Sequence, residues 1–472
     1  MSGLFGELNN SVKALTAASR SVELVGRNLA NVNNANYARQ RVVYGDRGSV
    51  QTDIGVQSLG VEAVGIQQLR DTLLDAQVVR ESSLQSSFEA EQSAYKNAQA
   101  NLGQSVDRSG ATSTTGSDGS TNGIAQGLSD FFNAFQSFSA SPTDVGERQS
   151  LVQKAGILTD AVNEADQRLT QLQSDLTTQA NSDVTDVNST LKSIAELNGQ
   201  IGRAEINQPG AAVDLRDQRQ ALVEHLATKM SIETKADPNF AGEIQVYARD
   251  ASNNPVQLIN LASTTGPVTL SGSVLSAGSP ATALVLKGGS INGTLTARDG
   301  AVATLRTNLD NLAKQLVTTV NATYNPTGTT GNFFDSTGLT AGTITVDGTL
   351  NATNLKSSDG GAAGDNTIAQ AVANLASKSF STPADSIDGT FSQYYSKTVT
   401  DLGQSLTTAN AHVTSQTSIA TLVKSQRDSV SGVSLDEEMA DMIKYQRSFQ
   451  ASSRIISIID DLLNTVVNKL GA

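Results

Sequence analysis

The feature that most constrains this chain is a coiled-coil repeat at both of its ends. Near the C-terminus, positions spaced alternately four and three residues apart are mostly apolar, which aligns them along one side of a helix. This C-terminal seam consists of Leu435, Met439, Met442, Phe449, Ile456, Leu463, Val467 and Leu470. A matching N-terminal seam consists of Leu8, Val12, Leu15, Val22 and Leu29. Because such helices gain most of their stability from packing, we expect the two ends to lie side by side.

The C-terminal helix carries more apolar surface than one partner helix can cover. A second row beside the seam contains Ile455, Ile459, Leu462 and Val466. Each large apolar side chain that stays exposed forgoes about 1.5–3 kcal/mol of burial energy. We therefore predict that both seams serve self-assembly, and that neighbouring copies cover the remaining surface. The ends would then be loose in a single molecule and ordered on assembly.

Between the ends, long helical patterns alternate with glycine-rich stretches of short apolar runs. Residues 231–294 show the short alternating runs between Gly, Pro and Asn that are typical of strands. We predict an α+β fold, mostly α, with nested discontinuous domains that each combine an outgoing and a returning segment. The predicted parts are a terminal coiled-coil domain of paired N- and C-terminal helices (1–69 with 431–472), a long-helix bundle domain (70–230 with 295–326 and 366–430), a small inserted all-β domain (231–294) and a Gly/Thr-rich β-like segment (327–365).

The composition argues against several classes of function. The formal net charge of −13 disfavours binding to nucleic acid or to an anionic membrane surface. The absence of Cys excludes disulfides and thiolate metal sites. No stretch approaches the roughly 18 apolar residues of a membrane span, and residues 1–32 do not have the pattern of a cleaved leader. We expect a protein that stays in the cytoplasm or is exported without a cleaved leader.

The sequence offers no convincing catalytic, cofactor or metal site. His225 and His412 are isolated, with no nucleophile motif and no metal-ligand spacing around them. The glycine run 360–364 lacks the Lys-Ser/Thr of a phosphate-binding loop. Asp436, Glu437 and Glu438 could resemble a cation site, but capping of the following helix explains them better. We therefore predict that the chain is not an enzyme and holds no cofactor.

The end segments resemble the axial proteins of the bacterial flagellum. The run from Asn28 to Gln40, Asn-Leu-Ala-Asn-Val-Asn-Asn-Ala-Asn-Tyr-Ala-Arg-Gln, is similar to the N-terminal motif shared by flagellar rod, hook and hook-associated proteins. Its key residues would be Asn28, Ala30, Asn31, Tyr37 and Gln40. The segments 434–439 and 445–452 resemble the C-terminal motif of the same family. One departure is that Ala35-Asn36 precede Tyr37 where many relatives carry Pro-Gly.

The interior resembles the hook-associated protein 1 family, a family of hook–filament junction proteins. The similar segments are Phe131–Phe135, Ser141-Pro142, Arg148-Gln149, Ile194–Asn198, Asp214–Arg219 and Gly289–Arg298. This resemblance implies a structural subunit that assembles at the hook–filament junction. It also implies export through the flagellar type III apparatus and an extracellular location on the flagellum. The implied partners are other copies in a ring at the hook tip, hook protein, filament-side junction protein, and a cytoplasmic export chaperone that holds the C-terminal helix.

Two other functions remain open on the sequence. A hook or distal-rod subunit would share the terminal motifs, although the long helical interior of 128–230 disfavours it. A secreted hydrolase or adhesin with coiled-coil ends is less favoured, and would require a convergent polar pocket in the β region.

Overall fold

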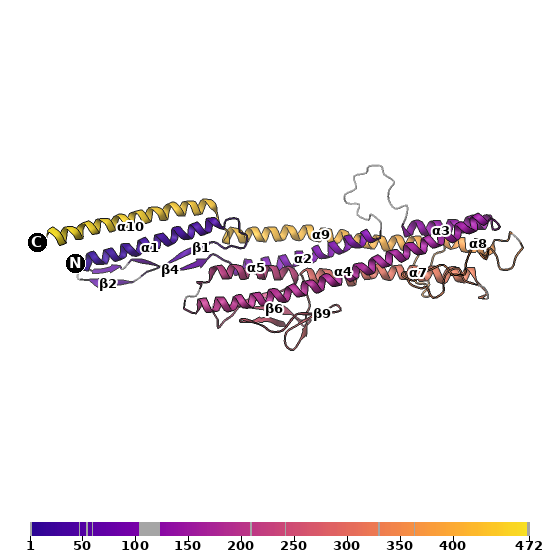
Figure 1. Ribbon diagram of the computed structural model, residues 1–472, viewed down its shortest axis with the longest axis horizontal. Coiled ribbons are helices and arrows are strands. Elements are labelled where there is room, and N and C mark those ends of the chain that lie inside the picture. Colours follow the sequence, from indigo (N-terminus) through magenta and orange to yellow (C-terminus); the bar gives the residue numbers. More distant parts are fainter. Residues whose placement is uncertain are drawn as a thin grey trace. The chain divides into compact units, whose positions relative to one another are not determined.

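The computed structural model describes residues 2–46, 48–52, 55–58, 60–102, 123–207, 210–240, 242–328, 331–362 and 364–469 (Figure 1). The described chain is mostly helical with small antiparallel sheets, which confirms the predicted fold class. None of the helices in these ranges is both long enough and apolar enough to cross a membrane. Seam residue Leu470 lies outside the described residues, and so do residues 103–122 of the predicted bundle domain.

The helices follow the predicted periodic segments closely. The longest of them has 61 residues and corresponds to the longest repeat in the sequence. The helices are α1 (Ser2–Ala30), α2 (Thr72–Asn101), α3 (Ile124–Ala140), α4 (Val145–Glu205), α5 (Val213–Lys229), α6 (Ser290–Ala297), the π-helical turn η1 (Arg298–Val302), α7 (Ala303–Tyr324), α8 (Thr367–Ala373), the 3-10 turn η2 (Asn374–Ser377), α9 (Phe391–Ser431) and α10 (Leu435–Lys469).

Within the described residues, the strands form four separate small sheets, all antiparallel. Strand β1 pairs with β4, β2 with β3, and the two larger sheets have the orders β5-β6-β7-β8 and β11-β10-β9. The strands are β1 (Gln40–Asp46), β2 (Ser49–Thr52), β3 (Gly55–Ser58), β4 (Val61–Gln68), β5 (Glu233–Ala236), β6 (Ile244–Arg249), β7 (Pro255–Asn260), β8 (Ser263–Thr264), β9 (Thr269–Ser271), β10 (Val274–Ala277) and β11 (Thr282–Ala283).

The chain forms two compact units, each assembled from outgoing and returning segments. The first, here called the terminal unit, contains Met1–Gln85, Val184–Gly289 and Gln416–Ala472. The second, the bundle unit, contains Ser86–Asp183 and Ser290–Ser415. The unit boundaries fall inside α2, α4 and α9 and at the start of α6, and they differ from the domain boundaries that the sequence suggested. Where a heptad repeat continues through a unit boundary, the sequence pattern does not change there and the boundary cannot be recognised from it.

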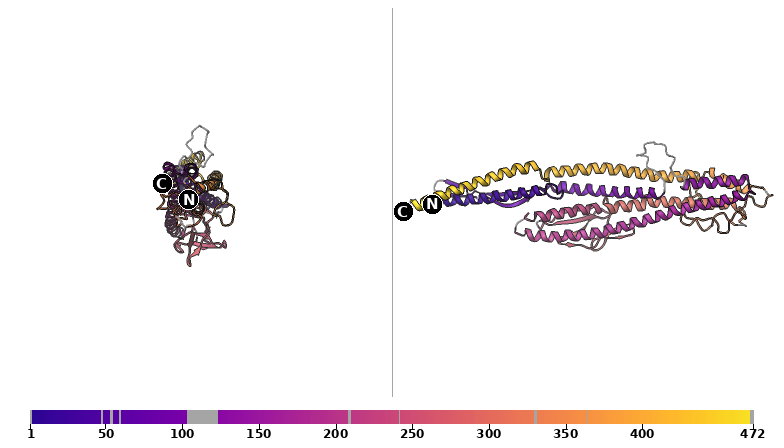
Figure 2. Two further views of the ribbon diagram at one scale, coloured as in Figure 1. Left: turned by 90° about the vertical axis from the view of Figure 1, so that its right-hand side faces the viewer. Right: turned by 45° about the horizontal axis from the view of Figure 1, so that its top comes forward.

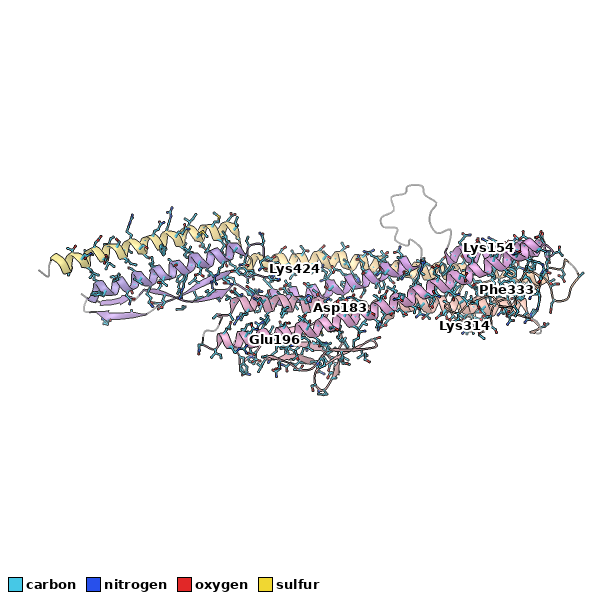
Figure 3. The ribbon with its side chains drawn as sticks, in the orientation of Figure 1. Lys154, Asp183, Glu196, Lys314, Phe333 and Lys424 are labelled. Carbon is cyan, nitrogen blue, oxygen red and sulfur yellow. The ribbon has the colours of Figure 1, made fainter. Side chains whose placement is uncertain are left out.

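The bundle unit is built around a cluster of aromatic rings. Phe131 is fully buried, and its ring centroid lies 5.1 Å from that of Phe135 and 5.7 Å from that of Phe333. Phe333 belongs to this helical interior (Figure 3). The Arg148 side chain donates to the carbonyl oxygens of Pro142 and Leu355 and lies over the Phe138 ring. Residues of the interior segments that resemble the family, such as Phe131 and Arg148, therefore stabilise the fold of a single molecule.

The Gly/Thr-rich segment 327–365 is part of the bundle unit and its described residues have little regular structure. Its described residues contain one isolated bridge, between Phe334 and Val346, and mainly turns. Asn321 of α7 holds the segment, because its amide oxygen accepts hydrogen bonds from the N–H groups of Phe333 and Phe334. Its amide nitrogen donates to the Phe334 carbonyl oxygen at 2.9 Å.

In the terminal unit, side chains of α4 hold the edges of the β domain. Asn198 donates to the carbonyl oxygens of Ile244 and Leu261, and its oxygen accepts from Arg219 at 2.7 Å. Gly289, at φ +87°, closes the β domain against α5: a Cβ there would come within 2.4 Å of the Lys229 carbonyl. Only glycine fits both the left-handed backbone and the close approach.

We expect Phe131→Ala to destabilise the bundle unit by about 3–5 kcal/mol, because it opens a cavity among closely packed rings. The matched control is Phe240→Ala, since the Phe240 side chain is half exposed and its truncation leaves no cavity. Urea unfolding followed by circular dichroism measures both. Equal shifts of the unfolding midpoint in the two variants would contradict this description of the core.

Candidate functional site

The terminal helices α1 and α10 lie side by side, and the β1–β4 hairpin packs on α1 (Figures 1 and 2). All three belong to the terminal unit. The expected pairing of the two ends therefore occurs within one chain.

The most buried face of α1 is lined by small and polar residues as well as apolar ones. Its fully buried residues are Ser11, Ala17, Ala18, Ser21, Leu24, Val25 and Asn28. The predicted N-terminal seam lies beside that face: Leu8, Leu15, Val22 and Leu29 are half-buried, and Val12 is exposed. The seam thus keeps accessible surface in a single molecule.

The C-terminal seam divides between covered and exposed positions. Met442, Ile456 and Leu463 are half-buried. Leu435, Met439 and Phe449 remain 51%, 50% and 39% exposed. Val467 lies within α10.

A further apolar row on α10, here called the outward row, is exposed along the helix. It consists of Ile455, Ile458, Leu462 and Val466, which are spaced three and four residues apart and are each between 39% and 53% exposed. The sequence placed Ile459 in the second row, but Ile459 is buried, and Ile458 takes its place in the exposed row. Adjacent residues of a helix point in directions about a quarter of a turn apart. Because Ile and Leu occupy several adjacent positions here, the spacing did not show which of them faces inward.

Where α1 ends and α10 begins, the Asn28 side chain makes hydrogen bonds through both its amide nitrogen and its amide oxygen. Its nitrogen donates to the Gln40 carbonyl oxygen and to Glu438 Oε2, each at 2.9 Å. Its oxygen accepts from the Tyr37 hydroxyl at 2.8 Å and from the Gln40 N–H at 3.2 Å. Asn28 is 1% exposed, so these bonds form away from solvent.

Arg39 completes this arrangement by binding the start of α10. Its Nε donates to Glu438 Oε1 and its Nη1 to Glu437 Oε2, both at 2.6 Å. Its backbone N–H donates to the Ser431 carbonyl at the end of α9. Burial alone would lower the pKa of Arg39, but the hydrogen bond to Glu438 and the two carboxylate charges raise it above its usual value. We call Asn28, Tyr37, Arg39, Gln40 and Glu438 the polar clamp.

The turn before Tyr37 forms without the Pro-Gly of many relatives. The Tyr37 N–H donates to the Asn34 carbonyl at 3.0 Å, and the Asn34 side chain accepts from the Asn36 N–H at 3.2 Å. Among the described non-glycine residues, only Asn253 and Leu261 have a positive φ, so this turn uses ordinary backbone conformations. The pKa of Tyr37 is raised, first by burial and then by Asp217, Asp214 and Glu438, which keeps the hydroxyl a donor.

The remaining motif residues have smaller roles. Asn31 donates to the Arg27 carbonyl at 3.0 Å, which closes the last turn of α1, and Ala30 is exposed. Glu437 and Glu438, which the sequence assigned to helix capping, bind Arg39. Sequence reasoning missed this pairing, although an acidic residue inside an apolar helix pattern is a sign of a buried partner.

Two family models match parts of the chain. A family model described as "Flagellar hook-associated protein FlgK helical domain" matches residues 112–334. A second, "Flagellar basal body rod FlgEFG protein C-terminal", matches residues 424–470.

Curated relatives match along essentially the whole chain. Flagellar hook-associated protein 1 of Bacillus subtilis is 25% identical, covering 100% of this chain and 99% of that protein. The protein of the same name from Salmonella typhimurium is 24% identical, covering 98% and 99%. Among solved structures, the flagellar hook junction protein FlgK from Burkholderia pseudomallei is 22% identical with a TM-score of 0.43, covering 53% of this chain and 43% of that one.

We expect Asn28→Ala to loosen the start of α10. The change removes the hydrogen-bond partner of the Tyr37 hydroxyl, the Gln40 N–H and Glu438 Oε2, at about 1–3 kcal/mol for each buried group, while Arg39 still binds Glu438 Oε1. Trypsin should then cleave at Lys444 and Arg447 of α10 at least about tenfold faster. Asn33→Ala is the matched control, because Asn33 lies in the same loop and is exposed. Equal cleavage rates in both variants would contradict the role of the clamp.

Proposed function

This chain belongs to the flagellar hook-associated protein 1 family and is a structural subunit of the hook–filament junction; from that premise we propose that its terminal helices build it into the flagellum. The observation that carries the proposal is the outward row of α10, which a single copy leaves exposed although α1 and α10 already pair. Contiguous apolar surface of this kind marks a protein interface.

The energy available to assembly is substantial. The side chains of the outward row are about half exposed, so covering each one contributes on the order of 1 kcal/mol. Leu435, Met439 and Phe449 of the seam add to this surface. The N-terminal seam, with Val12 exposed, offers further contact area on α1. We propose that copies of this chain cover one another in a ring at the hook tip, with hook protein below and filament-side junction protein above.

The same exposed surface suggests how the chain is handled before assembly. An exposed apolar helix face promotes aggregation in the cytoplasm. We propose that an export chaperone covers α10 there, and that the flagellar type III apparatus exports the chain to its extracellular position without removing its N-terminus. The proposed role is mechanical, with no catalytic activity and no cofactor.

The comparisons favour this function over the alternatives considered from the sequence. A hook or distal-rod subunit would share the terminal motifs, but the match at 112–334 is to the helical domain of a hook-associated protein. The full-length relatives carry that name as well. No observation favours a hydrolase or an adhesin.

A strain that lacks this chain should produce hooks that end without filaments, as seen by electron microscopy of negatively stained cells. Supplying the chain from a plasmid should restore filaments. Normal filaments in the deletion strain would contradict the proposed function.

A single substitution in the outward row tests the mechanism. Ile458→Glu places a charge on the surface that neighbours would cover, so filament growth should fall at least tenfold while the circular dichroism of the purified chain stays unchanged. Ser457→Glu adds the same charge at the adjacent exposed position and should leave filaments close to normal. Normal filament growth with Ile458→Glu would exclude the outward row as an assembly surface.

A further inference from the structure

The terminal unit contains a cleft that the terminal helices do not use. It has a volume of about 530 Å³ and lies between α2 and strands β5 and β6. The wall formed by α2 consists of Ala76, Val79, Arg80, Ser83 and Leu84. This spacing of three and four residues brings one face of the helix to the cleft.

The floor of the cleft is apolar and its mouth is open. Val79, Ile232 and Ala248 line it and are buried. Val285 also lines the cleft and is 42% exposed. The volume falls within the range of small-ligand pockets and fits a few side chains rather than a whole helix.

The charge of the cleft has the opposite sign to the charge of the chain. Arg80, Arg249 and Lys287 line it, and the carboxylate among its lining residues is Glu233. Arg249 Nε donates a hydrogen bond to Glu233 Oε1 at 2.8 Å. The hydrogen bond from Arg249 is the main reason that the pKa of Glu233 is lowered, and Lys235 and Lys287 lower it further.

The Arg80 side chain remains largely accessible. It is 66% exposed, and its Nε donates to the neighbouring Glu81 carboxylate at 3.0 Å. Glu81 also accepts a hydrogen bond from Gln416 at 2.7 Å, so its charge is shared with a second partner. The cleft therefore presents a positive rim above an apolar floor, within a chain of net charge −13.

We propose that this cleft receives a neighbouring copy of this chain in the junction ring, a contact separate from that of the terminal helices. The neighbour places an apolar side chain over Val79 and Ile232 and sets carboxylates against Arg80, Arg249 and Lys287. The reason for choosing a second copy is charge complementarity, because every neighbouring copy carries an excess of carboxylates. A cleft on one copy that meets a different surface on the next is the kind of interface that closes into a ring. The inference rests on the proposed function.

Photo-crosslinking tests which molecule occupies the cleft. A photoreactive amino acid replaces Val285 in a strain whose only copy of the chain is this variant, and the strain must still grow filaments. The expected product on illumination has twice the mass of the chain and yields peptides of this chain alone in mass spectrometry. A crosslink to a different protein, or no crosslink from cells with filaments, would overturn the inference.

Charge reversal provides the second test. Arg80→Glu combined with Lys287→Glu should abolish the crosslink and reduce filament number at least tenfold. The control combines Lys192→Glu with Lys314→Glu, which changes the net charge equally at exposed positions that do not line the cleft. The control should keep both crosslink and filaments, and a cleft variant that behaves like it would overturn the inference.

These outcomes separate the cleft from the proposed function. Normal filaments in a strain without the chain would remove the function itself. Filament loss in that strain, together with normal filaments in the cleft variant, would remove only the cleft contact.

Discussion

The hydrogen bond from Asn28 to Glu438 joins two residues that are 410 positions apart and holds the beginning of the chain to its end. With the ion pair between Arg39 and Glu438, it fixes where α10 begins against the turn that follows α1. That alignment decides which face of α10 meets α1 and which face is left to solvent. A buried carboxylate with both oxygens bonded is costly to displace, because removing one partner leaves a charge without compensation. The exposed outward row is thus a consequence of the clamp as well as of the apolar pattern.

Much of the fold could be predicted from the sequence because its signals are local. The long helical interior of 128–230 and the short runs of 231–294 each depend on neighbouring residues, and the structure has helices and strands there. Three of the four unit boundaries were not predictable in this way, since they lie within the continuous helices α2, α4 and α9. The segment 327–365 also lacked a clear signal, because Asn321 and buried Phe side chains hold it in place of a strand ladder.

The site was predicted less completely than the fold. The motif identified Asn28, Tyr37 and Gln40, and the structure brings them together. The pairing of Arg39 with Glu437 and Glu438 was missed, because capping explains acidic residues at a helix start equally well without a distant partner. Some seam residues are covered in the single chain and others are exposed, and the heptad spacing alone could not show which. Which of two adjacent isoleucines faces inward depends on small shifts in how α1 and α10 pack.

The account depends on α10 being only half covered in a single molecule. Hydrogen–deuterium exchange of 435–469, compared between the purified single chain and isolated hook–junction particles, tests this most directly. We expect amides of the outward row to exchange at least tenfold more slowly in the particles, because neighbouring copies cover that face. Equally slow amide exchange in the single chain and in the particles would contradict the account.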